Sequence, residues 1–193
     1  MVKNHVRILG VDPALSNMGL AFASLDLQTD ELILDDLRLV QTDSQKGKTV
    51  RQSSDDLRRA QILAGELMLA QNRADIVIAE IPTGTQSARG AMSNGIALGV
   101  IAGAHKPLIQ VNPTEVKMAS VGVKTATKSE MIEWAMKKYP SLPWLMRKSK
   151  GEYVPMNDNE HLADAVAIIV AGMQTAEFKN SLAMMKATLR ILR

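Results

Sequence analysis

The chain has 193 residues, 46% hydrophobic and 22% charged, a balance that is ordinary for a soluble globular protein of one compact domain. It has no cysteine, which excludes disulfides and thiolate metal sites, and no apolar run approaches the roughly 20 residues that cross a bilayer. With neither a membrane-spanning run nor a signal-peptide pattern, a cytoplasmic protein is the default expectation. The net charge is +3, with twelve Lys and Arg against eight Asp and Glu after residue 112, which suits an anionic partner such as nucleic acid.

Three apolar segments open the chain, and each is predicted to be a strand. They cover residues 6–11, 19–23 and 31–40, and the first is broken at Asp12-Pro13. The polar residues 41–50 are predicted to form a loop. A helix should follow, capped by Ser53 or Ser54, because apolar residues recur at helical spacing from there to about Asn72.

The second half of the chain alternates strands with helices. Residues 75–81 are nearly all apolar, as in strands that are buried on both faces of a parallel sheet, and residues 107–111 predict a fifth strand. Residues 87–104, rich in Ala and Gly, predict a helix that packs unusually close to a neighbour. A helical turn should open at 112–114, with helices at 128–139, 162–172 and 178–192, the last of them basic. This order predicts one α/β domain over 1–193, with a single layer of sheet and helices around it.

Three acidic residues lie at the edges of apolar elements, where an unpaired carboxylate is costly. Asp12 ends the first strand, Glu80 lies near the end of strand 75–81, and Asp164 interrupts the apolar helix 162–172. His161 lies three residues before Asp164 and therefore on the same helical face. Each residue alone has a plainer interpretation as a turn, cap or surface position. Together they predict a site for divalent cations, which offset several carboxylates held close together.

Four motifs resemble those of the RuvC-type Holliday junction resolvases and follow one another in the family's order. The chain is similar to a divergent, phage-type member, which implies the cytoplasm of a bacterium, or of the host if the protein is phage-encoded. The first motif is ILGVDP at residues 8–13 with Gly19, and the second is the strand that ends in Glu80. The third resembles a segment with two functional lysines, here Lys117 and Lys128, and the fourth is HLADAVA at residues 161–167. In the family's last motif two metal-site positions are also three apart, the first Asp or His and the second Asp. The resemblance spans about residues 6–172.

The resemblance implies an RNase H-like fold, with a mixed five-stranded sheet of three leading antiparallel strands and then parallel strands, flanked by helices. It implies a crossover junction endodeoxyribonuclease that nicks four-way DNA junctions as a homodimer. Helix 87–104 matches the family's dimer helix in position, with internal packing as the alternative. Two Mg²⁺ or Mn²⁺ ions in each active site would be held by Asp12, Glu80, His161 and Asp164. Lys117 and Lys128 would contact the scissile region.

Three features depart from the family pattern. Ala14-Leu15 replaces the usual Gly-Ser, and residues 82–85 lack the aromatic that the family commonly wedges among junction bases. Residues 140–157 form a longer, basic insertion that is interrupted at Pro140, Pro143, Gly151 and Pro155. It either grips DNA in place of the missing wedge or is a solvated loop with Trp144 packed on the core. The predicted DNA contacts are Lys117, Lys124, Lys128, Trp144, Arg147, Lys148, Lys150 and Tyr153.

Other functions fit parts of the sequence. One is an RNase H-like nuclease that acts on flaps, forks or RNA hybrids, and another is a non-catalytic junction-binding protein. An actin-like or sugar-kinase ATPase also opens on a strand with an Asp near a Gly. That fold needs a duplicated domain and a second Gly-rich phosphate loop, and the chain is about half the required length.

Overall fold

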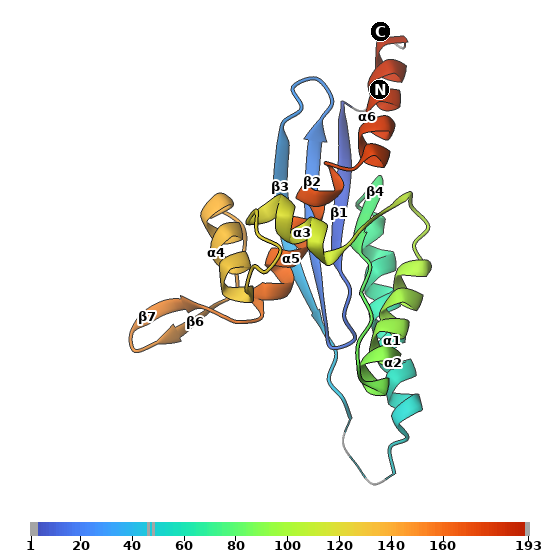
Figure 1. Ribbon diagram of the computed structural model, residues 1–193, viewed down its shortest axis with the longest axis vertical. Coiled ribbons are helices and arrows are strands. Elements are labelled where there is room, and N and C mark those ends of the chain that lie inside the picture. The colour runs from blue at the N-terminus through green and yellow to red at the C-terminus, as the bar shows by residue number, and fades with distance from the viewer. Residues whose placement is uncertain (1–3, 46, 48, 192–193) are drawn as a thin grey trace.

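The computed structural model describes residues 4–45, 47 and 49–191. It contains a five-stranded sheet, and Figure 1 shows the helices packed around the sheet. The sheet has the order β3-β2-β1-β4-β5. Its strands are β1 (His5–Asp12), β2 (Asn17–Asp26), β3 (Leu32–Gln41), β4 (Ile76–Glu80) and β5 (Leu108–Val111). The first three pair antiparallel, and β4 and β5 continue the sheet parallel to β1. The predicted mixed sheet is confirmed.

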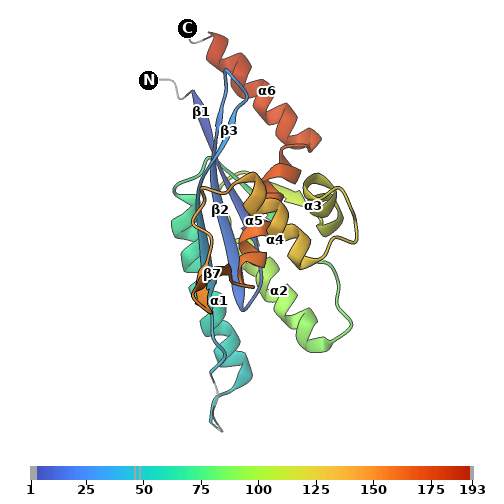
Figure 2. The same cartoon turned by 90° about the vertical axis from the view of Figure 1, so that its left-hand side faces the viewer.

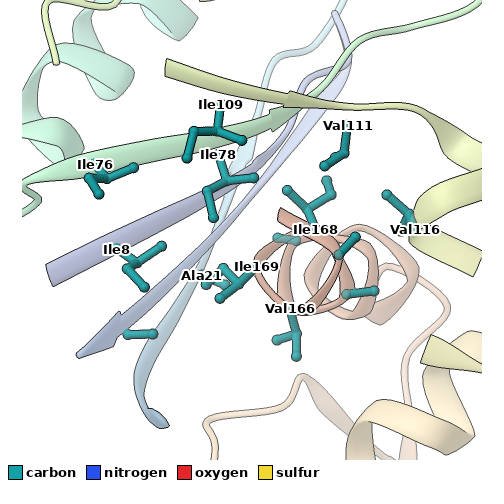
Figure 3. Packing of buried hydrophobic residues seen from close by; sticks show 14 of the residues in the cluster. Ile8, Ala21, Ile76, Ile78, Ile109, Val111, Val116, Val166, Ile168 and Ile169 are labelled. Atoms are coloured by element: carbon teal, nitrogen blue, oxygen red, sulfur yellow. The ribbon is translucent and has the colours of Figure 1, made fainter. Parts of the chain in front are cut away.

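Six helices accompany the sheet in the described part of the chain. The sheet separates the apolar core into two layers, and helices cover each layer. α1 (Gln52–Gln71) and α2 (Ala88–Ala102) contribute Leu63 and Val100 to the core on one face. α3 (Pro113–Ser120), α4 (Lys128–Lys138), α5 (Asn159–Gly172) and α6 (Ala176–Ile191) cover the other face. Figure 3 shows Ile168 and Ile169 of α5 against Ile78 of the central sheet. No described helix combines the length and apolar character that spanning a bilayer requires.

Glycines let α5 approach the sheet closely. A Cβ built at Gly10 would lie 2.6 Å from Cγ1 of Ile169 and would overlap the carbonyl oxygen of Ala165. A Cβ at Gly19 would overlap the carbonyl of His161, in the first turn of the helix. The two missing side chains therefore set how deeply α5 lies on β1 and β2. They also set the position of the polar residues at its N-terminal end.

Gly19→Ala is expected to destabilise the protein by about 1–3 kcal/mol or more, because the new methyl group must displace rigid backbone. Urea unfolding of both proteins measures this difference. The control is Gly65→Ala on α1, where a Cβ meets no atom within 4 Å. Alanine there should stabilise the helix by up to about 1 kcal/mol. A Gly19→Ala protein as stable as the wild type would show that α5 is not held at this depth.

The predicted start of α1 is wrong. The cap residue is Arg51, which makes no side-chain cap bond, and Ser53 and Ser54 lie inside the first turn. The acidic residues that follow are buried and paired: Asp55 with Arg58, and Asp56 with Arg89 of α2. The first pair is local, between residues three apart on α1, and the second is tertiary, so charged side chains and not a serine cap supply the polar contacts near the helix start. At the other end of the chain, residue 192 of the predicted last helix lies outside the described residues.

The insertion at 140–157 is more regular than the sequence predicts. β6 (Met146–Ser149) and β7 (Glu152–Pro155) pair antiparallel as a hairpin. Lys150 and Gly151 form its tip with φ values of 50° and 94°, which suit a type I′ turn that matches the twist of the strands. Pro155 ends β7, where a missing backbone donor is tolerated. The expected break at Gly151 is therefore the turn of a hairpin.

Gly95 and Gly99 of α2 do not pack against the rest of the described chain. A Cβ built at Gly95 or Gly99 would meet no atom within 4 Å. Close internal packing is therefore the wrong explanation for these two glycines, although Val100 and Ile101 of the same helix are buried.

Candidate active site

Two neighbouring parallel strands bring the first two predicted acids to one edge of the sheet. Val11 of β1 pairs with Ala79 of β4, and the next residue of each strand is Asp12 or Glu80. Because the strands are parallel, their carboxyl ends meet at the same edge. α5 crosses this edge with His161 and Asp164 in its first two turns. The structure thus brings together all four residues that the sequence predicted to bind metal.

His161 is held between two partners by its two ring nitrogens. Nδ1 lies 2.8 Å from Oδ2 of Asp12, and Nε2 lies 3.2 Å from the side-chain nitrogen of Asn17. Gln41 donates to the amide oxygen of Asn17 at 3.3 Å, so the Asn17 nitrogen faces the histidine as a donor. In the neutral imidazole, Nε2 therefore accepts and Nδ1 carries the proton that is donated to Asp12.

The acids of the site repel one another. Burial raises the pKa of Glu80 to about 8, reinforced by the charges of Asp12 and Asp164 and opposed by that of Lys117. Burial also raises the pKa of Asp164 to about 7, reinforced by Asp12 and by Glu160 and opposed by His161 and Lys117. The positive charge around these carboxylates is thus too small to keep them ionised at their ordinary pKa values.

Two residues of the site were missed by the sequence analysis, Asn17 and Glu160. Oε1 of Glu160 lies 3.4 Å from Nε2 of His161 and accepts a hydrogen bond from Nζ of Lys128 at 2.8 Å. Burial lowers the pKa of His161, but the hydrogen bond to Asp12 and the charges of Asp12, Glu160 and Asp164 outweigh it, so the pKa is raised. The sequence signal for Glu160 was its position directly before His161. Asn17 has no local signal, because only the pairing of β1 with β2 brings it near.

The site suits a divalent cation in charge and in donor type. Carboxylate oxygens with one imidazole nitrogen are ligands for Mg²⁺ or Mn²⁺. A bound cation would also offset the burial and the neighbouring negative charges that raise the pKa values of Glu80 and Asp164. The side chains are not arranged as a finished site. No group of three or more His, Asp or Glu side chains within residues 4–45, 47 and 49–191 stands in a metal-binding arrangement. The His161–Asp12 hydrogen bond occupies Oδ2, one of the two carboxylate oxygens of Asp12.

The predicted DNA contacts fall into three groups. Lys117 on α3 opposes the rise in the pKa values of Glu80 and Asp164, and Lys128 pairs with Glu160. The two lysines therefore lie at the site. Trp144 packs against the core and donates its indole N–H to the carbonyl of Tyr139 at 2.9 Å. Trp144 is therefore packed on the core, as the second interpretation of the insertion expected. The others are exposed away from the acids: Lys124 between α3 and α4, and Arg147, Lys148, Lys150 and Tyr153 on the hairpin.

Solved structures with this architecture include junction resolvases. RuvC of T. thermophilus in complex with a Holliday junction substrate is 22% identical with a TM-score of 0.60, over 86% of this chain and 92% of that one. A second Thermus thermophilus RuvC structure has a TM-score of 0.59 at 22% identity, over 92% of this chain and 96% of that one. The chain has the RNase H-like fold of RuvC.

The Fowlpox virus resolvase, solved with Holliday junction DNA, shares the fold at 17% identity and a TM-score of 0.51, over 91% of this chain and 98% of that one. No protein-family model matches the sequence, and no curated protein matches it. The RuvC-like fold therefore rests on the three-dimensional similarity, and it confirms the predicted fold class. At these identities the similarity shows the fold and not the activity.

Proposed function

We propose that the protein is a structure-selective endonuclease that resolves four-way DNA junctions by paired, metal-dependent phosphodiester hydrolysis. The observation that carries this proposal is the cluster of Asp12, Glu80 and Asp164, whose burial and mutual repulsion a cation would offset. The fold supports it, because a RuvC and a poxvirus resolvase of the same fold have been solved with junction DNA.

Each residue of the site has a role in this chemistry. Bound divalent cations supply the activation of an attacking water and the stabilisation of the leaving 3′ oxygen. Asp12, between the other acids and His161, would hold them centrally, with Glu80 on one side and Asp164 and His161 on the other. Lys117 and Lys128 would stabilise the negative charge that develops on the phosphate. Glu160 keeps Lys128 at the site through their hydrogen bond.

The test is a panel of labelled DNA substrates incubated with Mg²⁺ or Mn²⁺. The panel contains a four-way junction, a flap, a fork, an RNA–DNA hybrid and a linear duplex. We expect symmetric nicks in the four-way junction and little cleavage of the duplex. Preference for flaps or forks would favour the alternative RNase H-like nuclease. Junction binding without cleavage in either metal would favour a non-catalytic junction-binding protein.

His161 predicts the metal preference. Its imidazole is a softer ligand than a carboxylate, so Mn²⁺ should support cleavage at least as well as Mg²⁺ at matched concentrations. His161→Asp should shift the ratio of the two rates toward Mg²⁺, because it restores an all-oxygen ligand set. The measurement is the initial rate of junction cleavage across a titration of each metal. A higher wild-type rate in Mg²⁺ would contradict this assignment.

A homodimer through α2 would place two such sites on one junction. Gly95 and Gly99 are open to solvent, and Met92 and Leu98 on the same helix are 55% and 38% exposed. Small residues allow two helix backbones to approach closely. Gly95→Arg is expected to convert a dimer into a monomer in analytical ultracentrifugation, and to uncouple the two nicks. A wild-type protein that sediments as a monomer at micromolar concentration would exclude this arrangement.

A further inference from the structure

We propose that the β6–β7 hairpin is an arm that receives an unpaired base of branched DNA on the ring of Tyr153. This inference rests on the proposed function, since it names the element that recognises the branch. The hairpin projects away from the sheet in Figure 1, and it points toward the viewer in Figure 2. None of its eight strand residues is buried.

One face of the arm is free along its whole length. Residues directly opposite each other in an antiparallel pair share a face, so Lys148 lies beside Tyr153, and Met146 beside Pro155. All four are exposed, Tyr153 at 72% and Met146 at 41%. An isolated two-stranded hairpin is only marginally stable in water. A bound partner would therefore stabilise this face as well as occupy it.

Tyr153 differs from the other aromatic residues in being exposed to solvent. The chain has six, all within the described residues. Phe22 and Phe178 are buried, and Trp134, Tyr139 and Trp144 are partly buried against the core. Tyr153 is the one that is exposed. The segment after Glu80 has no aromatic residue, so Tyr153 is the aromatic surface that this chain offers to an unpaired base.

The charge of the arm identifies its partner as a polyanion. Arg147, Lys148 and Lys150 are opposed by one acid, Glu152. Basic groups that follow a phosphate backbone, combined with an aromatic ring on which a base stacks, are the two elements of single-strand nucleic-acid binding. The pairing of Lys148 with Tyr153 puts one of each on the same face.

The end of the hairpin nearest the sheet is fixed to α5, the helix that carries His161 and Asp164. The side chain of Asn159 is fully buried, and it donates to the carbonyl oxygen of Leu145 and accepts from its N–H, both at 2.8 Å. Met156 donates its backbone N–H to the same carbonyl at 2.9 Å. Asn159 is the first residue of α5, two residues before His161. The arm and the acidic cluster therefore share one rigid support.

The length of the hairpin and its distance from the acids suit a contact between the hairpin and DNA near the branch point. Four residues per strand give an arm of roughly 13 Å. Asp164 lies five residues along α5 from Asn159, or about 7.5 Å along the helix axis. The strand length and the helix rise together put the tip on the order of 20 Å from Asp164, which corresponds to about six base steps at 3.4 Å each. An arm of this reach contacts nucleotides a few steps from the cleaved phosphate.

The experiment measures binding to a four-way junction that carries 2-aminopurine at the branch, and to a linear duplex of equal length, both in EDTA. Tyr153→Ala should weaken junction binding by at least about fivefold, which corresponds to about 1 kcal/mol. Duplex binding should change by less than about twofold. Tyr153→Phe, which keeps the ring, should bind the junction like the wild type and give the same 2-aminopurine signal. An unchanged thermal midpoint establishes that both variants fold.

Each outcome has a distinct meaning. Unchanged junction affinity for Tyr153→Ala would overturn the proposal that the hairpin binds an unpaired base. Junction cleavage by the wild type would still support the proposed nuclease function. Equal weakening on junction and duplex also overturns it, because the contact would then not read the branch. In a third outcome, the wild type cleaves no branched DNA while Tyr153→Ala weakens binding to the junction alone. That result would refute the proposed nuclease function and support base binding by the hairpin.

Discussion

Asp12→Asn is expected to lower the rate of four-way junction cleavage by about 10³-fold or more, while junction affinity stays within about threefold. The loss follows because Asp12 is the acid between Glu80, Asp164 and His161, and a cation contributes several kcal/mol of transition-state stabilisation. Asparagine keeps an oxygen that accepts from Nδ1 of His161, so the fold around the site should survive. Binding is retained because it depends on basic surface and not on the metal.

The measurement combines single-turnover cleavage in Mn²⁺ with equilibrium binding in EDTA. Asp35→Asn is the matched control, because Asp35 lies on β3 and its carboxylate accepts from Ser24 at an exposed position. It should cleave at the wild-type rate. A parallel loss of binding and cleavage in Asp12→Asn would instead assign Asp12 a structural role.

Glu80→Gln is expected to stabilise the metal-free protein at pH 8 by about 1–3 kcal/mol, and to have little effect near pH 4.5. The ordinary pKa of this carboxyl is 4.5, and burial with the nearby charges of Asp12 and Asp164 raises it to about 8. The folded state therefore binds the proton more tightly than the unfolded chain does. As the pH rises from about 4.5 to 8, the unfolded chain releases its proton first, and the free energy of unfolding falls. The raised pKa of Asp164 acts in the same direction.

The expected gain is below the roughly 5 kcal/mol of the full shift, because water that enters the site reduces the cost of the charge. Addition of Mn²⁺ should reverse the order of stabilities, since a ligand that binds only the folded state stabilises it. Wild type should then gain more than Glu80→Gln. Urea unfolding at both pH values, with EDTA or Mn²⁺, measures all of these differences.

Glu133→Gln on α4 is the control for that series, since Glu133 is exposed. It should leave stability unchanged under every condition. Loss of stability in metal-free Glu80→Gln at pH 8 would mean that the Glu80 carboxylate is already compensated without a cation.

The core strands and the positions of the acids were predictable because their signals are local. The apolar runs around Leu9 and Val77 are buried on both faces of the sheet, and such runs are visible without knowing their neighbours. Asp12, Glu80 and Asp164 were conspicuous for the same reason, since an acid that interrupts an apolar run has a high desolvation cost. Local signals failed at the start of α1, where Asp56 pairs with Arg89 across 33 residues of sequence.

The sequence by itself determined the fold class, the order of strands and helices, and the acids that end the apolar elements, because hydrophobic periodicity and the cost of burying charge act within a few residues. Only the tertiary structure decided that Glu160 and Asn17 complete the surroundings of His161, that Trp144 supports the hairpin while Tyr153 is free, and that Gly95 and Gly99 face outward. Each of these depends on the direction of a side chain relative to a partner that is distant in sequence. Packing sets that direction, and local composition does not.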